Sequence, residues 1–494
     1  MSNKKSNGTS RSPLEGSTPT DVGGRGVQPN KVDRRNFIKK AGAGGLGLFG
    51  MFALPFEDQI SHLAQNVNRN SSPSDLEITD LRIAEIDGIP FRVPLIRIDT
   101  NQGISGYGEV RDGGAKEYAL FLKSRLLGEN PCNVEKVFKI IKQFGGHGRQ
   151  GGGVSGVETA LWDLTGKAYG VPVYQLLGGK YRDKVRLYCD TTTSDDPHEY
   201  ARRMQERVDM GYTFLKMDMG IGLVDDEEGS LANTREYGPK GQRELRSQYS
   251  GEQGDYGQID HPFTRVQVTE KGLERMMEYL RVMRDTIGYE IPMGTDHWGH
   301  FDKNEAIKIA RATEPYTLAY VEDLIAWQYV DEWKEISEST TTPTMTGEDI
   351  YLLDGFRELI DKQAVDMIHP DLGSAGGILE TKRIGDYAMQ NGIAMMLHYA
   401  GSPFGFMASV HAAAATENFV ALEHHSVDTP NWYDLIQEDK STIFQDGYTP
   451  VPEKPGLGVE INEEAVREHL IEDADYFEPT PEWNEIRTWD RTWS

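Results

Sequence analysis

Ionisable residues recur at the ends of short apolar segments in the second half of the chain. The segments TFLKMD, EIPMGTD, LAYVED, TPTMTGE, AVDMIHPD, IAMMLHY and FVALEHH bring, in order, Lys216 and Asp218, Asp296, Glu322, Glu348, Asp371, His398 and Glu423. A strand buried on both faces is normally apolar throughout. Any one of these residues could cap a helix or face solvent. As a set they predict one functional site, because converging charges are costly to desolvate unless they pair.

Three of these residues, Asp296, Glu322 and Glu348, are evenly spaced. Glu322 follows Asp296 by 26 residues, and Glu348 follows Glu322 by 26. If each step is one strand–helix repeat, three carboxylates from adjacent strands point at one spot. Three such ligands, with room for water and substrate oxygens, suit octahedral Mg²⁺. Zinc is disfavoured, because no cysteine or histidine occupies these positions.

His398 and Asp371 end two neighbouring segments of the same series. A carboxylate beside an imidazole fixes its tautomer and raises its basicity. The pair therefore predicts a general base with its orienting carboxylate.

The elements that must position these residues alternate from Val185 onward between short apolar strands and amphipathic helices. About eight such units in series predict an α/β fold with a parallel (β/α)7β TIM-like barrel, whose active site lies at the C-terminal ends of the strands. We assign residues 184–440 to this catalytic barrel. Residues 76–183, with three strands followed by helices, predict an N-terminal α+β capping domain, and residues 441–494 a C-terminal segment that returns to the cap.

The N-terminal residues have a different character. Residues 1–56 predict a disordered tail followed by an export signal, in which DRRNFIKK with Arg34 and Arg35 precedes a short apolar run. This pattern is typical of twin-arginine signals, which are read by the twin-arginine export machinery. The alternative is a basic tail beside a chance apolar run. Residues 57–75 are predicted to be a linker. We expect an exported protein, periplasmic or anchored to the membrane and facing the periplasm.

The composition limits the kinds of partner. A formal net charge of −26 argues against nucleic-acid binding, which needs a basic surface. The two cysteines, Cys132 and Cys189, are too few for a disulfide framework or a zinc site.

The chain from about Leu76 to His469 resembles the enolase superfamily, in its branch of mandelate racemase and muconate lactonizing enzyme. The resemblance rests on LIRIDTNQGISGYGE and GVSGVETALWDLTGKAYGVPVYQLLGG in the cap, and on YVED, TGED, HPDLGSAGGILETKRI and LHYAGSPFGFMASVHAAA in the barrel. It implies that Asp296, Glu322 and Glu348 bind Mg²⁺, which holds the substrate carboxylate. It also implies that His398 and Asp371 form the catalytic dyad and that Glu423 hydrogen-bonds the substrate carboxylate.

Departures from the family pattern narrow the reaction. Many members carry Lys-x-Lys at the end of the second barrel strand, where this chain has Lys216-Met217-Asp218. The missing second lysine disfavours a two-base racemase and favours a one-base dehydratase that acts on an acid sugar. Some dehydratases carry a histidine two places after the strand-3 aspartate. That place is Trp298 here, flanked by His297 and His300, and we take His300 as a candidate acid and His297 as a substrate contact.

Substrate contacts are expected from Asp218 and from an insertion at residues 220–270. The insertion is polar and includes Arg243, which could meet a substrate carboxylate or be a solvated loop residue. The cap near Ile89 and residues 145–147 should also contribute to specificity.

The sequence thus predicts a metal-dependent carbon–oxygen lyase that converts a sugar acid to a 2-keto-3-deoxy acid. Two alternatives stay open. The first is an epimerase or cycloisomerase in which Lys216 acts from the other face, and the second is a non-catalytic exported sugar-acid binding protein. We expect a homo-oligomer.

Overall fold

The computed structural model describes residues 71–89, 91–224, 227–232, 267–296 and 301–485. The predicted tail and export signal lie outside these ranges, as do most of the predicted linker and insertion. Among the described residues, no helix combines the length and apolar character needed to cross a membrane.

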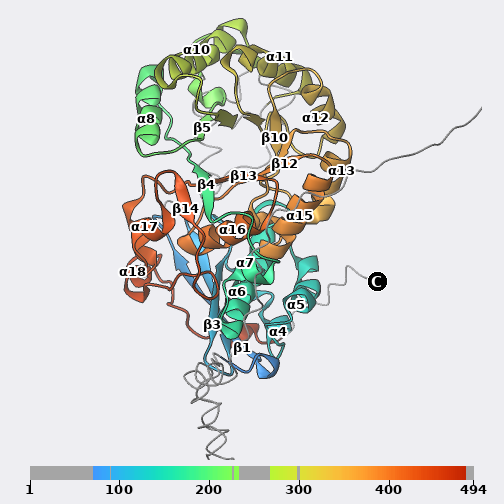
Figure 1. The fold of residues 1–494 in the computed structure, drawn as a ribbon, viewed down its shortest axis with the longest axis vertical. Helices are drawn as coiled ribbons and strands as arrows, with labels where there is room; N and C mark the ends of the chain where they lie inside the picture. Colours follow the sequence, from blue (N-terminus) through green and yellow to red (C-terminus); the bar gives the residue numbers. More distant parts are fainter. Residues whose placement is uncertain (1–70, 90, 225–226, 233–266, 297–300, 486–494) are drawn as a thin grey trace, which may run out of the picture. The chain divides into compact units, whose positions relative to one another are not determined.

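The cap is built on a three-stranded antiparallel sheet. Its strands β1 (Ile78–Ile86), β2 (Val93–Thr100) and β3 (Ser105–Glu109) lie side by side in chain order. The helices that follow are α3 (Glu117–Leu120), α4 (Lys123–Leu126), α5 (Val134–Ile141), α6 (Gly152–Tyr169) and α7 (Val173–Leu176). Figure 1 shows α6 against this sheet in the lower part of the view. The approach is close, since a Cβ atom on Gly108 of β3 would lie 2.2 Å from the carbonyl oxygen of Gly156.

Helix α6 is buried nearly all round, whereas its sequence suggests one apolar stripe. Glu158, Thr159 and Asp163 are buried together with the apolar residues. The reason is that α6 packs against the cap sheet and also against α14 and α15 of the barrel. Glu158 accepts hydrogen bonds from the backbone N–H groups of Ile378 (2.7 Å) and Leu379 (3.1 Å), at the start of α15.

The barrel confirms the predicted (β/α)7β arrangement. Among the described residues its parallel strands are β4 (Lys184–Tyr188), β5 (Leu215–Asp218), β8 (Met293–Asp296), β9 (Val321–Glu322), β10 (Thr344–Thr346), β11 (Met367–Ile368), β12 (Ala394–Leu397) and β13 (Phe419–Glu423). Strand β13 pairs with β4, and a parallel bridge between Cys189 and Leu215 joins β4 to β5. These contacts close the circle of strands.

Among the described residues, seven helices connect these strands, and Figure 1 shows α8, α10, α11 and α12 around the strands in its upper part. They are α8 (Pro197–Asp209), α10 (Glu270–Ile287), α11 (Lys303–Thr313), α12 (Val330–Ser337), α13 (Leu352–Asp361), α15 (Ile378–Gln390) and α16 (Pro403–Ala415). A short helix, α14 (Leu372–Ala375), precedes α15, and the strand pair β6 (Leu231–Ala232) and β7 (Gln267–Val268) lies within the predicted insertion.

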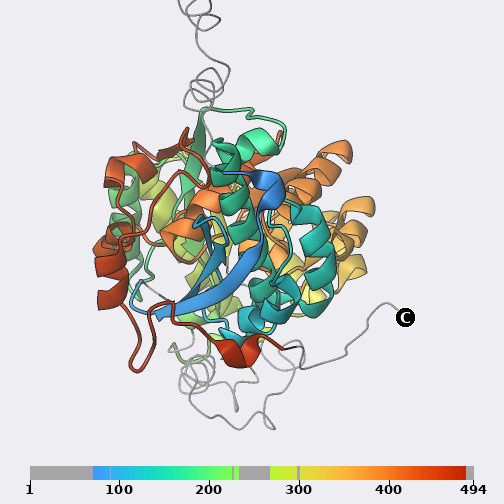
Figure 2. The same ribbon diagram turned by 90° about the horizontal axis from the view of Figure 1, so that it is seen from below.

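The C-terminal segment contacts both the barrel and the cap. Its helix α17 (Lys440–Ile443) leads into β14 (Tyr448–Pro450), which pairs antiparallel with β4. Beyond α18 (Glu463–Glu468), the chain runs along β1, where Ile471 and Phe477 donate backbone hydrogen bonds to Glu85 and Ile83. Figure 2 shows this segment in red beside the blue cap sheet.

Short 3-10 helices complete the described elements. They are η1 (Pro73–Asp75), η2 (Lys142–Phe144), η3 (Gly148–Gly151), η4 (Ile221–Leu223), η7 (Glu314–Tyr316), η8 (Pro430–Leu435) and η9 (Pro481–Trp483).

Candidate active site

The strand register brings the predicted site residues to one end of the barrel. Asp218 on β5 lies opposite Asp296 on β8, and Met345 on β10 lies opposite Glu322 on β9. A parallel bridge joins Asp371 to His398, and Glu423 on β13 lies opposite Tyr188 on β4. All these residues end their strands or follow them directly, so their side chains gather at the C-terminal mouth.

Lys216 lies among three buried carboxylates. Its Nζ is 2.6 Å from Asp296 Oδ2, 2.9 Å from Glu423 Oε1 and 4.0 Å from Glu322 Oε2. Burial by itself lowers the pKa of Lys216, but the three carboxylates raise it well above its usual value. The side chain is therefore an ammonium, whereas the epimerase alternative would need Lys216 as a neutral base.

The described residues contain a group of acidic side chains that could hold a metal ion. Oxygens of Asp296, Glu322 and Asp323 lie within 4.8 Å of one another. Glu322 is fully buried, and its Oε2 atom has no hydrogen-bond partner among the residues that the structure describes. Burial and the neighbouring Asp296 raise the pKa of Glu322 well above its usual value. A buried carboxylate oxygen without a donor, next to a second carboxylate, fits a hard divalent cation such as Mg²⁺.

Glu348 lies apart from that group, although the sequence places it in the metal triad. Its Oε1 is 3.2 Å from Arg111 Nη2, and its Oε2 is 3.2 Å from His398 Nε2. Burial raises the pKa of Glu348, but these cationic neighbours lower it well below its usual value. Its place as the third ligand remains a prediction. Asp323, which follows Glu322 directly, is the member of the group that the sequence reasoning missed.

His398 and Asp371 form the expected pair. His398 Nδ1 lies 2.5 Å from Asp371 Oδ2, which leaves Nε2 directed toward the site, 3.7 Å from Glu423 Oε2. Burial lowers the pKa of His398, but Glu348, Glu423 and Asp371 raise it to about 10. Among these carboxylates, Glu348 raises the pKa of His398 the most. A cation that binds Glu348 would therefore lower the pKa of His398.

A second histidine, His369, connects the two sides of the site and was not expected from the sequence. Its Nδ1 contacts Glu322, and its Nε2 lies 2.6 Å from the hydroxyl of Tyr188, which donates to Glu423 Oε2 at 3.0 Å. Burial lowers the pKa of His369 to about 4, so the ring is neutral. The motif HPD could have indicated it, because His369 directly follows β11 and precedes Asp371 by two residues.

The cap contributes Arg111, which sequence reasoning also missed. This residue follows β3, and its guanidinium contacts Glu348 and lies near Asp371. A second cap contact is the ring of Phe91, which packs edge-on against His425 with centroids 5.1 Å apart. His425 in turn lies 3.2 Å from Asp190, two residues beyond Tyr188. Through Arg111 and Phe91 the cap therefore reaches the barrel mouth.

Other predicted substrate contacts are only partly described. The backbone N–H of Asp218 donates to the hydroxyl of Tyr200 at 2.9 Å. His297, His300 and Arg243 lie outside the described residues, so their roles remain predictions. The ring of His147 packs against Trp327, and its Nδ1 accepts from the backbone N–H of Tyr351 at 3.1 Å.

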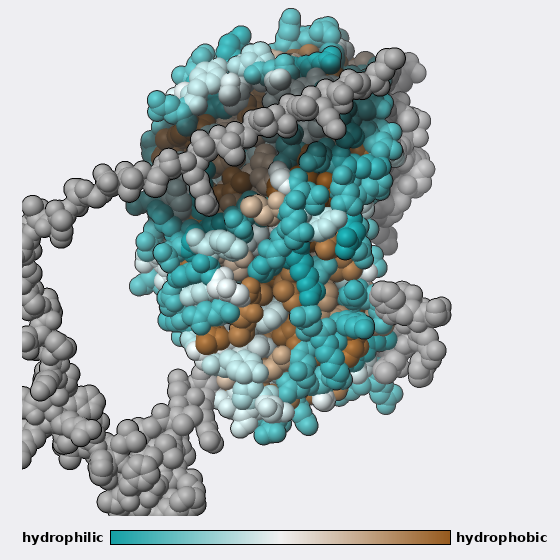
Figure 3. All heavy atoms as spheres, turned by 45° about the vertical axis from the view of Figure 1, so that its right-hand side comes forward, coloured by the Kyte–Doolittle hydropathy of each residue, from teal (hydrophilic) through white to brown (hydrophobic). Residues whose placement is uncertain are grey.

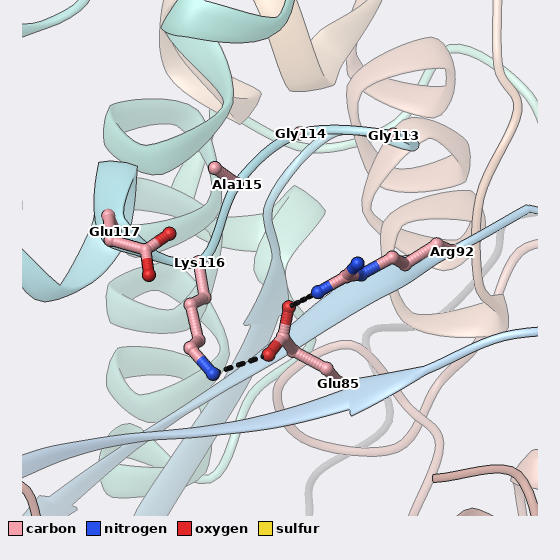
Figure 4. Close-up of a pocket in the computed structure, with 7 residues that line it drawn as sticks. All are labelled: Glu85, Arg92, Gly113, Gly114, Ala115, Lys116 and Glu117. Atoms are coloured by element: carbon pink, nitrogen blue, oxygen red, sulfur yellow. Dashed lines mark hydrogen bonds and ion pairs between the residues drawn. The ribbon is translucent and has the colours of Figure 1, made fainter. Parts of the chain in front are cut away.

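A pocket of about 290 Å³ lies in the cap, away from these residues. Figure 4 shows Glu85 on its wall between Arg92 and Lys116, at 2.5 and 2.6 Å. The two cations compensate the buried carboxylate, which gives this pocket a structural explanation: the salt bridges tie together the two loops that follow β1 and β3.

Comparison with known proteins places these features in a family. Residues 199–465 match the family described as enolase C-terminal domain-like, and residues 89–178 match the mandelate racemase / muconate lactonizing enzyme N-terminal domain. A D-xylonate dehydratase of Haloferax volcanii is 34% identical over 420 residues, covering 83% of this chain and 93% of the relative. A D-galactonate dehydratase family member of Musicola paradisiaca is 29% identical over 440 residues, covering 85% and 99%.

Solved structures agree with this match. A mandelate racemase/muconate lactonizing enzyme-like protein from Rubrobacter xylanophilus superimposes with a TM-score of 0.69 at 31% identity, covering 81% of this chain and 99% of that protein.

Proposed function

Since this chain belongs to the enolase superfamily, in the branch of mandelate racemase and muconate lactonizing enzyme, we propose that it dehydrates a sugar acid to a 2-keto-3-deoxy acid with the help of Mg²⁺. Its relatives named as D-xylonate and D-galactonate dehydratases are hydro-lyases, and this chain is a metal-dependent enzyme of the same class. The observation that carries the proposal is the His398–Asp371 pair at the barrel mouth, in which His398 Nδ1 lies 2.5 Å from Asp371 Oδ2.

We assign the metal to Asp296 and Glu322, with Glu348 as the third ligand and Asp323 beside them. When bound, Mg²⁺ would hold the substrate carboxylate and stabilise the negative charge that develops as the α-proton leaves. It would also take up part of the charge of Glu348, which lowers the pKa of His398 toward the neutral form that a base requires.

His398 Nε2 then accepts the proton from C2, while Asp371 keeps Nδ1 protonated and the ring oriented. The C2–H electron pair forms the C2=C3 bond as the C3–O bond breaks, and the proton that His398 took from C2 passes to the departing hydroxyl, which leaves as water. The resulting enol becomes the 2-keto-3-deoxy acid by tautomerisation. Glu423 accepts hydrogen bonds from Lys216 at 2.9 Å and from Tyr188 at 3.0 Å, and it would donate to the substrate carboxylate once it has taken up a proton.

The test is a screen of aldonic, uronic and aldaric acids, including D-xylonate and D-galactonate, with the full chain and Mg²⁺. Loss of one water from the substrate, read by mass spectrometry, supports the proposal. In D₂O, a one-base dehydratase should leave recovered substrate undeuterated, whereas an epimerase would exchange the α-proton. Metal-dependent binding without product across the panel would instead support a binding protein.

We expect His398→Asn to lower kcat by at least 10²–10⁴-fold, on the order of the whole contribution of a general base. Mg²⁺ binding should survive, because His398 is not a ligand in this assignment. His198→Asn is the matched control, since His198 is exposed at the start of α8. Full activity of His398→Asn would overturn the assignment of the base.

A further inference from the structure

Arg111 joins the cap to the barrel site through several side-chain contacts. It follows β3 by two residues, and its side chain is 1% exposed. Four carboxylates surround the guanidinium, those of Asp112, Glu348, Asp349 and Asp371. A buried arginine needs such partners, because the loss of hydration is otherwise uncompensated.

The contacts of Arg111 divide between two barrel loops. Toward the loop after β10, Nη2 donates to Glu348 Oε1 at 3.2 Å, and Nη1 lies 3.1 Å from the Glu348 carbonyl oxygen and 2.5 Å from Asp349 Oδ1. Toward the loop after β11, Nη1 lies 2.5 Å from Ser374 Oγ, and Nε lies 3.8 Å from Asp371 Oδ2. One guanidinium thus joins the predicted third metal ligand to the carboxylate that orients His398.

We propose that Arg111 is a positioning residue by which the cap completes the barrel site. It fixes the carboxylate of Glu348 from one side while His398 meets it from the other, and it holds the turn that carries Asp371. Glu348 and the His398–Asp371 dyad are then correctly oriented only when the cap packs against the barrel. This inference rests on the metal and dyad assignments of the proposed function.

A lysine could not replace Arg111 in this role. The planar fork of arginine donates in several fixed directions, whereas a lysine ammonium is a single point charge on a flexible stem. The fork here serves Glu348, Asp349 and Ser374 at the same time. Arg111→Lys therefore keeps the charge and loses the geometry, which separates positioning from simple electrostatics.

The experiment compares Arg111→Met and Arg111→Lys with Arg97→Met in the full chain. Arg97 is the matched control, a partly buried cap arginine that lies 3.0 and 3.2 Å from the two oxygens of Asp99 and makes no described contact with the site. Mg²⁺ affinity is measured by calorimetry without substrate, and kcat and KM are measured on the acid sugar that the wild type dehydrates. Thermal melting checks that each variant is folded.

Both Arg111 variants should bind Mg²⁺ about tenfold more weakly and lose about 10–100-fold in kcat, with a smaller change in KM. Loss of a positive charge alone would tighten Mg²⁺ binding, so weaker binding by Arg111→Met reports lost positioning. Arg97→Met should match the wild type in both readouts. A further variant, Arg111→Ala, removes the guanidinium group altogether. Free guanidinium, added well below denaturing concentrations, should partly restore kcat in this variant.

Unchanged or tighter Mg²⁺ binding by Arg111→Met would overturn the inference, as would wild-type behaviour of Arg111→Lys. If the wild type dehydrates no acid sugar, the proposed function is refuted, but the role of Arg111 is not. The Mg²⁺ measurement still decides the role of Arg111, because it needs no substrate. If Arg111→Met does not fold, Arg111→Lys carries the test.

Discussion

At the scale of single residues, the metal ligands are where geometry and sequence differ most. The sequence spacing selects Asp296, Glu322 and Glu348, whereas the oxygens that converge belong to Asp296, Glu322 and Asp323. Glu348 is engaged by Arg111 and His398. Spacing could indicate which strand each carboxylate follows, but not how a cap arginine orients one of them.

We expect Glu322→Gln and Glu348→Gln each to weaken Mg²⁺ binding by about tenfold or more, because each removes a negatively charged ligand. Asp323→Asn should weaken it less, since Asp323 Oδ1 already accepts a hydrogen bond from Thr346 Oγ1 at 2.6 Å. Calorimetric titration of the three variants gives the order. A larger loss in Asp323→Asn than in Glu348→Gln would make Asp323 the third ligand.

At the scale of elements, Glu109 at the end of β3 supports the turn between β12 and α16. Its carboxylate accepts from the hydroxyl of Tyr399 at 2.6 Å and from the backbone N–H of Ser402 at 3.1 Å. Ser402 caps α16, and Tyr399 directly follows His398. A buried acid of the cap thus holds the turn that begins at the proposed base.

Glu109→Ala should lower the free energy of unfolding by about 2–4 kcal/mol, because it leaves buried donors without an acceptor. It should also lower kcat, since the turn beside His398 loses its support. Chemical denaturation and steady-state kinetics measure the two effects. Glu117→Ala, at an exposed site in the same region, should change stability by no more than about 0.5 kcal/mol. Wild-type stability of Glu109→Ala would contradict this account.

Much of the architecture could be predicted at this scale. The alternation of strands and helices predicted the barrel. The polar residues at the strand ends predicted a site that contains His398, Asp371, Lys216 and Glu423, and the structure brings these four residues together. The contacts of Arg111, Glu109 and Glu158 could not be predicted, because they join segments more than 200 residues apart. Local periodicity carries no information about such pairs.

At the scale of the whole molecule, the composition is strongly acidic, with a formal net charge of −26. Figure 3 shows hydrophilic side chains over much of one face, with apolar side chains visible between them. The interior contains titratable groups that make stability depend on pH. Burial lowers the pKa of His369 and His411 to about 4, and that of His424 to about 3.

These histidines predict a loss of stability in acid. Each is neutral in the folded protein, whereas the unfolded chain takes up a proton below pH 6.5. Their stabilising contribution is therefore present above about pH 6.5 and is lost as the pH falls toward the folded pKa. Between the folded pKa and about pH 6.5, the free energy of unfolding rises with pH. We expect His424→Gln to reduce this slope by up to about 1.4 kcal/mol per pH unit. Denaturation at several pH values measures the slope, and identical slopes would contradict the prediction.

We propose that the N-terminal residues direct export through the twin-arginine route, on the evidence of Arg34 and Arg35 before an apolar run. Replacement of both arginines by lysine should retain the protein inside the cell, as measured by fractionation. The double variant Lys4→Arg, Lys5→Arg serves as the control. Unchanged export of the Arg34→Lys, Arg35→Lys protein would refute the route.

The pairing of the C-terminal segment with β1 has a consequence for synthesis. Strand β1 is among the first folded elements to leave the ribosome, yet the backbone groups of Ile83 and Glu85 meet their partners only at Phe477 and Ile471. The nascent cap must therefore keep this edge open while nearly the whole barrel is translated. A chain that lacks Ile471 and Phe477 would leave the carbonyl groups of Glu85 and Ile83 without these two partners and would expose that edge of β1.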